Sequence, residues 1–179
     1  CEHSDIRGEP VYQASDGGYI VIIAGIDPGK TGGIALVDTL ISGSEQACPM
    51  PITGKEIDGH TIAGLLANAD LVVLEKVASR PGQGVASMFK FGMVYGIIQG
   101  ICLGGAIPYE LVTPQHWKKV VLAGTTKDKD AAIAYCTRRF PHVSLLATER
   151  SRNPHDGMAD ALCLMEFGRR LFAVEAMAA

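Results

Sequence analysis

Short apolar runs and longer stretches with helical spacing alternate along the chain. Residues 19–25 form an apolar, β-rich run, and residues 33–38 form a second one after the Asp27-Pro28-Gly29 turn. Two strands this close in sequence predict a β-hairpin. Further short apolar runs at 71–74 and 109–112 predict two more strands, and residues 45–50 predict a weaker one.

The stretches between these runs predict helices over residues 57–68, 85–103, 115–122, 129–140 and 156–174. Pro114 suits the first turn of the third of these helices. This order predicts an α/β fold, a mixed sheet with helices on its faces, in one domain over residues 19–175. Residues 1–18 are polar and lack periodicity, so we expect a disordered or processed tail.

Composition narrows the class of protein. Of the 179 residues, 47% are hydrophobic, which fits one well-buried domain. No apolar run reaches the roughly 18 residues that a membrane span needs. The longest candidate, 94–107, is interrupted by glycines and is expected to be a buried or interface helix, so we expect no membrane partner. The five cysteines include no CxxC pair, which predicts neither a disulfide framework nor a zinc site and fits a reducing compartment.

The charge of the chain says less about its function than the hydrophobic pattern says about its fold. The formal net charge of −3 counts mildly against nucleic-acid binding, although a carboxylate cluster that binds cations is itself acidic. Lysines and arginines gather between residues 118 and 139, where solvated helix faces are an equally good explanation.

The segment from Ala24 to Thr31, AGIDPGKT, nearly matches the phosphate-binding loop GxxxxGK[ST]. Asp27 would place a negative charge inside that anion site, and Pro28 lacks the N–H that the loop needs. The residues that follow predict a strand rather than the required helix. A nucleotide-binding ATPase is therefore a disfavoured alternative.

Three acidic residues favour metal chemistry instead. Asp27 follows one predicted strand, Glu75 closes another, and Asp160 lies among small and apolar residues of the last predicted helix. Alone, each has an ordinary explanation as a turn residue, a polar strand end or a paired acid. Hard cations such as Mg²⁺ bind oxygen ligands held on rigid elements. Together the three acids favour a metal-dependent hydrolase of phosphodiester bonds.

The motifs GIDPG at 25–29, LEK at 74–76 and HDGMADAL at 155–162 resemble those of the RuvC-type Holliday junction resolvases, in the RNase H-like superfamily. PGQGVASMFKFGMVYG at 81–96 and PYELVTPQHWKK at 108–119 are similar to the phage and plastid branches of that family. The resemblance spans most of residues 20–171.

The resemblance implies an RNase H-like fold, with a five-stranded mixed β-sheet flanked by α-helices. It implies that Asp27, Glu75 and Asp160 hold two Mg²⁺ ions, which Mn²⁺ could replace. It also implies a homodimer that nicks a four-way DNA junction symmetrically. The glycines of 85–105 suit close approach between helices, so we expect the dimer interface there.

The fourth metal ligand has two candidates. Asp156 and Asp160 lie four residues apart, on one face of a helix. The resemblance points instead to His155, which could also act as a general base or simply cap the helix.

The resemblance places Lys118 and Lys129 on the DNA backbone, and it implies that the region around Phe89 and Lys90 probes the junction centre. Packing in the core or at the dimer interface is an alternative for Phe89 and Phe91. Lys119 and Arg80 complete the expected DNA-binding set, and Trp117 is expected in the core.

Other functions share parts of this pattern. A ribonuclease H or a transposase-type nuclease would use the same carboxylates, and a catalytically inactive homologue would keep the fold. The expected location is a bacterial or phage-infected cytoplasm, or else an organelle such as a chloroplast or mitochondrion.

Overall fold

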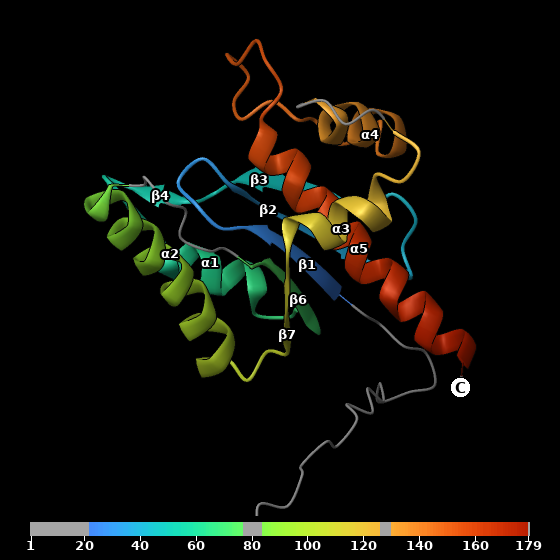
Figure 1. Cartoon of the computed structure of the whole chain (residues 1–179), viewed down its shortest axis with the longest axis horizontal. Coiled ribbons are helices and arrows are strands. Elements are labelled where there is room, and N and C mark those ends of the chain that lie inside the picture. The colour runs from blue at the N-terminus through green and yellow to red at the C-terminus, as the bar shows by residue number, and fades with distance from the viewer. Residues whose placement is uncertain (1–21, 77–83, 126–129, 179) are drawn as a thin grey trace, which may run out of the picture.

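The computed structural model describes residues 22–76, 84–125 and 130–178. Its main sheet has the strand order β3-β2-β1-β6-β7 (Figure 1). The strands are β1 (Ile22–Asp27), β2 (Gly33–Asp38), β3 (Gln46–Pro49), β6 (Leu71–Glu75) and β7 (Tyr109–Val112). β2 runs antiparallel to β1 and β3, whereas β6 runs parallel to β1 and β7. The prediction of a five-stranded mixed sheet is confirmed.

Helices cover both faces of this sheet (Figure 1). One face carries α3 (Pro114–Val121), α4 (Ala131–Arg139) and α5 (Asp156–Ala178), and the other carries α1 (Gly59–Leu66) and α2 (Val85–Gly104). Alternate strand residues feed the two cores. Ile23 and Val73 belong to the α3–α5 side, while Ala24 and Val72 belong to the α1–α2 side.

Two local features differ from the prediction. A small hairpin of β4 (Ile52–Thr53) and β5 (Glu56–Ile57) stands where none was expected. The helix predicted from residue 57 begins at Gly59, because Asp58 accepts a hydrogen bond from the Thr61 N–H at 3.0 Å and caps it. Strands of two residues carry too little periodicity to be recognised. The tail predicted over residues 1–18 lies outside the described residues.

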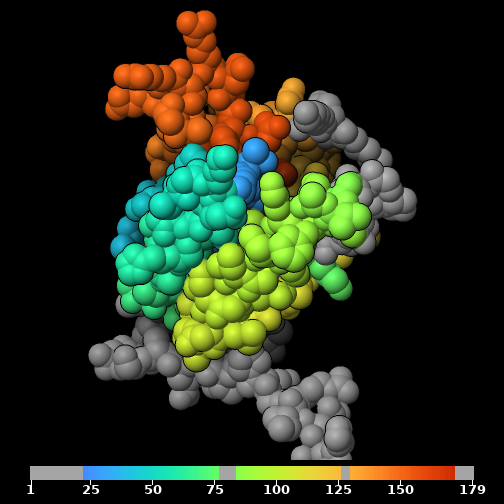
Figure 2. All heavy atoms as spheres, turned by 90° about the vertical axis from the view of Figure 1, so that its left-hand side faces the viewer, coloured from blue at the N-terminus to red at the C-terminus, as the bar shows by residue number. Residues whose placement is uncertain are grey.

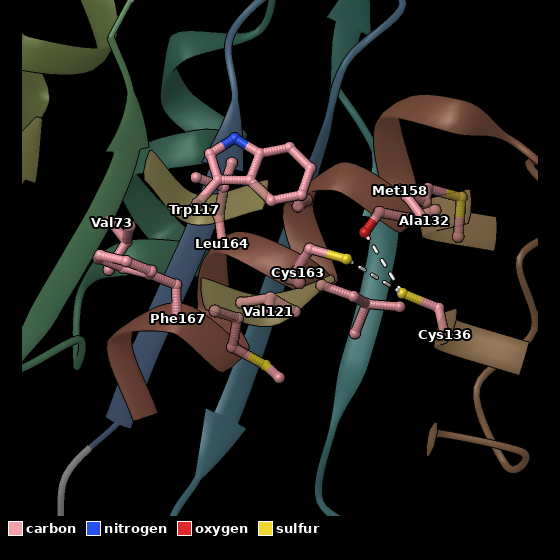
Figure 3. Packing of buried hydrophobic residues seen from close by; sticks show 14 of the residues in the cluster. Val73, Trp117, Val121, Ala132, Cys136, Met158, Cys163, Leu164 and Phe167 are labelled. Atoms are coloured by element: carbon pink, nitrogen blue, oxygen red, sulfur yellow. Dashed lines mark hydrogen bonds between the residues drawn. The ribbon is translucent and has the colours of Figure 1, made fainter. Parts of the chain in front are cut away.

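The core on the α5 side is built around large buried side chains (Figure 3). Trp117 is fully buried there, which confirms the prediction that it belongs to the core. The thiols of Cys136 on α4 and Cys163 on α5 lie 3.7 Å apart, and the Cys136 thiol donates to the Ala159 carbonyl at 3.4 Å. These two thiols are free, as are those of Cys48 and Cys102.

Helix α5 lies in direct backbone contact with the β1–β2 hairpin. A Cβ added at Gly25 would lie 2.2 Å from the Ala161 carbonyl oxygen and 2.3 Å from the Met165 nitrogen. A Cβ at Gly33 would lie 2.7 Å from the Gly157 oxygen, and Gly157 itself bridges to Gly32. Only glycine at these positions allows the helix to lie this close.

Helix α2 has an unusually exposed apolar surface. By length and composition alone it could cross a membrane, and 17% of its apolar window is buried. A count of uninterrupted apolar residues does not find this helix, because glycines interrupt the run while the mean hydropathy stays high. Val94, Ile98 and Cys102 form its buried side.

The close packing of α5 gives a direct prediction for Gly25→Ala. The added methyl group meets backbone atoms, which cannot rotate away, so α5 has to move from the sheet. We expect a loss of about 3 kcal/mol in the free energy of unfolding, measured by urea denaturation. Gly64→Ala is the control, because nothing lies within 4 Å of a Cβ there, and it should be neutral or slightly stabilising. Equal stability of Gly25→Ala and the wild type would contradict the packing described.

Candidate active site

Asp27 and Glu75 emerge at the same edge of the sheet. Asp27 is the last residue of β1 and pairs with Gly33, the first residue of β2. In the parallel pair of β1 and β6, Ile26 is opposite Leu74, so Asp27 and Glu75 come next on neighbouring strands. The carboxyl ends of parallel strands are where α/β folds commonly place their sites.

Asp160 reaches this edge from α5. The glycine contacts hold the first turns of this helix on the hairpin, with Gly157 beside Gly32 and Ala161 beside Gly25. Asp160 lies between these two contact points and is half-buried. The structure thus brings together the three acids that the sequence analysis selected.

The electrostatics show that the three carboxylates sense one another. Burial, followed by repulsion from Glu75 and then Asp160, raises the pKa of Asp27 to about 7, while Lys118 acts in the opposite direction. Burial also raises the pKa of Asp160 to about 6, with Lys118 opposing the rise and Glu75 and Asp156 adding to it. Asp27 and Asp160 resist ionisation in this way, and a bound cation would relieve the repulsion between them.

A buried tryptophan fixes the position of Glu75. The indole Nε1–H of Trp117 donates to the Glu75 Oε1 at 2.9 Å. Trp117 lies on α3, whose start is capped by Thr113 with Pro114 in the first turn. Trp117 was expected in the core, but its contact with Glu75 was not predicted from the sequence. A buried indole N–H needs an acceptor, and that requirement was the available signal.

Lys118 belongs to the carboxylate cluster. Its Nζ lies 5.0 Å from the centroid of the Trp117 ring, and its charge acts on both Asp27 and Asp160. Its side chain is nevertheless exposed. Lys118 therefore combines contact with solvent and proximity to the acids.

His155 caps α5 in this structure. Its Nδ1 accepts a hydrogen bond from the Met158 N–H at 3.2 Å, and its own backbone N–H donates to the Leu145 carbonyl at 2.8 Å. This leaves Nε2 as the ring nitrogen open to another partner. Asp156 is exposed in the first turn of α5 and interacts electrostatically with Asp160. Both remain predicted candidates for the fourth ligand.

The donor set consists of hard oxygen atoms, which suits Mg²⁺. Within residues 22–76, 84–125 and 130–178, no three His, Cys, Asp or Glu side chains are already arranged around one common metal position. Carboxylates that repel one another have reason to stay apart until a cation joins them.

The predicted DNA-binding residues that the structure describes lie on α2 and α3. The start of α2 lies beside the turn that follows β1, since a Cβ at Gly29 would be 3.7 Å from the Phe91 ring (Figure 2). Phe89 is 69% exposed and Lys90 is exposed, so Phe89 is not a core residue of the single chain. Lys119 is exposed on α3. Lys129 and Arg80 lie outside the described residues.

The residues after Asp27 do not form a phosphate-binding loop. That loop leads from a strand into a helix, whereas Gly33 begins β2 here. The helix that a nucleotide-binding ATPase would need after this loop is replaced by a strand.

No protein-family model and no curated protein sequence matches the chain. Among solved structures, the Thermus thermophilus RuvC structure is 19% identical with a TM-score of 0.52, covering 85% of this chain and 97% of that one. T. thermophilus RuvC in complex with Holliday junction substrate is 15% identical with a TM-score of 0.54, covering 84% and 96%. The yeast mitochondrial Holliday junction resolvase Ydc2 is 15% identical with a TM-score of 0.52, covering 86% and 80%. The chain has the fold of these proteins.

Proposed function

We propose that the chain is a metal-dependent endonuclease that cuts four-way DNA junctions. The observation that carries this proposal is the convergence of Asp27, Glu75 and Asp160 at one sheet edge. The fold supports it, since the similar structures are resolvases and one contains a Holliday junction substrate. The sources of these proteins, a bacterium and yeast mitochondria, are compatible with either proposed location, a bacterial cytoplasm or an organelle.

The three carboxylates would hold two Mg²⁺ or Mn²⁺ ions, with His155 Nε2 or Asp156 as a further ligand. Bound metal ions would supply a nucleophilic water and stabilise the leaving oxygen. Trp117 keeps the Glu75 carboxylate oriented toward the cluster. Lys118 is exposed beside the acids, so its ammonium group can also bind the phosphate that is being cut.

We also propose that two copies associate through α2. Gly92, Gly96, Gly100 and Gly104 recur every fourth residue, on the side opposite Val94, Ile98 and Cys102, and nothing lies within 4 Å of a Cβ at any of the four. Exposed apolar side chains such as Met93, Ile97 and Leu103 accompany this glycine stripe. An exposed helix gains nothing from four glycines by itself, whereas a second helix can approach closely along them.

The nuclease proposal predicts metal-dependent cutting of a synthetic four-way junction. With Mg²⁺, we expect the wild type to nick the junction at least about a hundredfold faster than linear duplex or an RNA–DNA hybrid. Asp27→Asn keeps the shape of the side chain and removes its charge, so it should lower cutting by about a thousandfold or more while junction binding persists. Equal cutting of all three substrates would sink the junction-specific assignment and leave a general nuclease.

The carboxylate cluster also predicts how stability depends on pH. A carboxyl group with a raised folded-state pKa stabilises the fold below its unfolded pKa and loses this contribution as the pH rises through its folded pKa. The pKa of Asp27 rises from 3.8 to about 7. In EDTA, Asp27→Asn should therefore gain stability over the wild type between about pH 4 and pH 7, by roughly 2 kcal/mol after solvent screening.

Thermal melts at several pH values measure this difference. Added Mg²⁺ should raise the Tm of the wild type more at high than at low pH, because protons and cations compete for the same oxygens. The Asn variant should show little of this Mg²⁺ effect. A wild-type Tm that does not change on addition of Mg²⁺ at any pH would contradict a cation site formed by these acids.

The proposed α2 interface predicts that replacing its glycines with alanine stabilises the helix in a monomer but weakens the dimer. Gly96→Ala with Gly100→Ala should raise the helix stability of a monomer by up to about 1 kcal/mol per site. In a dimer the new methyl groups separate the helices, so the dissociation constant measured by sedimentation should rise at least about tenfold. Gly64→Ala on α1 is the matched control and should leave association unchanged. An unaltered dimer in the double variant would place the interface elsewhere.

A further inference from the structure

The connection between α4 and α5 carries a feature that the proposed function does not use. It covers residues 141–155 and contains no helix or strand. Connections of this length without regular structure are uncommon in compact domains and are often functional. Figure 2 shows this segment, in orange, rising clear of the body of the molecule.

Hydrogen bonds define both the base and the tip of this loop. At the base, the His155 N–H donates to the carbonyl of Leu145, a residue buried in the α5-side core. At the tip, the Thr148 N–H donates to the Ser151 Oγ at 3.2 Å, and the Ser151 N–H donates to the Thr148 carbonyl at 3.0 Å. The two hydroxyl groups are also 3.0 Å apart. The tip is therefore a closed turn on an anchored base.

Arg150 lies within this closed turn, and Arg152 directly follows it. Arg150 and Arg152 are both exposed, and within the described part of the chain neither has an ion pair or a hydrogen bond. By contrast, Arg169 and Arg170 both bind Glu166. Exposed Glu149 lies in the same turn, so this stretch carries one acidic and two basic side chains and is locally positive in a chain of net charge −3.

The loop leads directly to the carboxylate cluster. It ends at His155, the cap of α5, and Gly157 follows two residues later in a bridge to Gly32. Gly32 belongs to the turn that follows Asp27, and Figure 2 shows the orange loop above the blue of this hairpin. The base of the loop therefore joins the fold at the same edge of the sheet as Asp27.

We propose that Arg150 and Arg152 bind the phosphate backbone of a duplex arm next to the phosphate that is cut. This inference rests on the proposed nuclease function. The planar guanidinium group donates two parallel hydrogen bonds to a phosphate and is the side chain best suited to that anion. Contacts of this kind position a duplex without reading its sequence. The loop is thus a clamp for a DNA arm.

The test is junction binding by Arg150→Ala with Arg152→Ala, measured by fluorescence anisotropy across a KCl series in EDTA, where nothing is cut. Each lost phosphate contact removes about 0.9 from the slope of log K against log salt. We expect the slope to fall by about 1.8 and affinity near 0.1 M salt to fall at least about tenfold. Arg150→Lys with Arg152→Lys keeps the charges and should restore most of the slope but only part of the affinity.

Arg138→Ala with Arg139→Ala on α4 changes the net charge equally and is the matched control. An equal loss of affinity in this control would overturn the clamp, because the effect would then be general electrostatics. Wild-type affinity and slope in the Arg150/Arg152 variant would overturn it as well, while leaving the nuclease proposal intact. A wild type that neither binds nor cuts a junction would overturn both. Circular dichroism of each variant verifies the fold.

Discussion

The backbone contact between α5 and the β1–β2 hairpin is the constraint on which the site depends. Gly25, Gly33 and Gly157 remove the side chains that would otherwise separate the helix from the sheet. Asp160 lies between two of these contact points, so its distance from Asp27 is set by main-chain atoms. Rigid elements of this kind hold functional groups more accurately than loops do. The resulting burial and repulsion raise the pKa values of both acids, so their ionised forms oppose the stability of the fold in the absence of a cation.

A second set of contacts places α3 against this frame. Glu166 on α5 is almost fully buried and binds Arg169 and Arg170. Arg170 also donates to the Val120 carbonyl at 2.7 Å and to the Tyr135 hydroxyl at 2.9 Å, so one side chain joins α5 to α3 and α4. Through α3, the same contacts fix Trp117, whose indole holds Glu75. The orientation of the Glu75 carboxylate therefore depends on the Glu166–Arg170 ion pair, which lies further along α5 than Asp160.

The fold could be predicted from the sequence where neighbouring residues alone determine the structure, as in periodic segments and at the ends of strands. β2 and β7 have the predicted bounds, and Asp27, Glu75 and Asp160 could be selected because each closes or interrupts an apolar pattern. The features that were not predicted depend on very short strands or on contacts between residues far apart in the sequence. The β4–β5 hairpin has two residues in each strand, and the Trp117–Glu75 hydrogen bond joins residues 42 positions apart. His155 shows the same limit, since its cap on α5 is a local contact, whereas a partner for its Nε2 would depend on the tertiary structure.

The distribution of charge reconciles an acidic chain with the proposed nucleic-acid substrate. The net charge of −3 includes acids gathered at one sheet edge, where bound cations would reverse the local sign. Exposed cationic side chains lie around that edge, with Lys118 beside the acids, Lys90 at the start of α2 and Arg150 and Arg152 on the loop before α5. A DNA backbone would therefore meet net positive charge at the acids themselves only after metal had bound, whereas it would meet Lys118 and the other exposed cations in any case. Because contacts with exposed cations are screened by salt more strongly than partly buried ones, binding and cutting should respond differently to ionic strength. The salt dependence of binding reports on the exposed cations, and that of cutting reports on the carboxylate cluster. The glycine contacts under α5 hold the cluster and the base of the loop at fixed positions relative to each other.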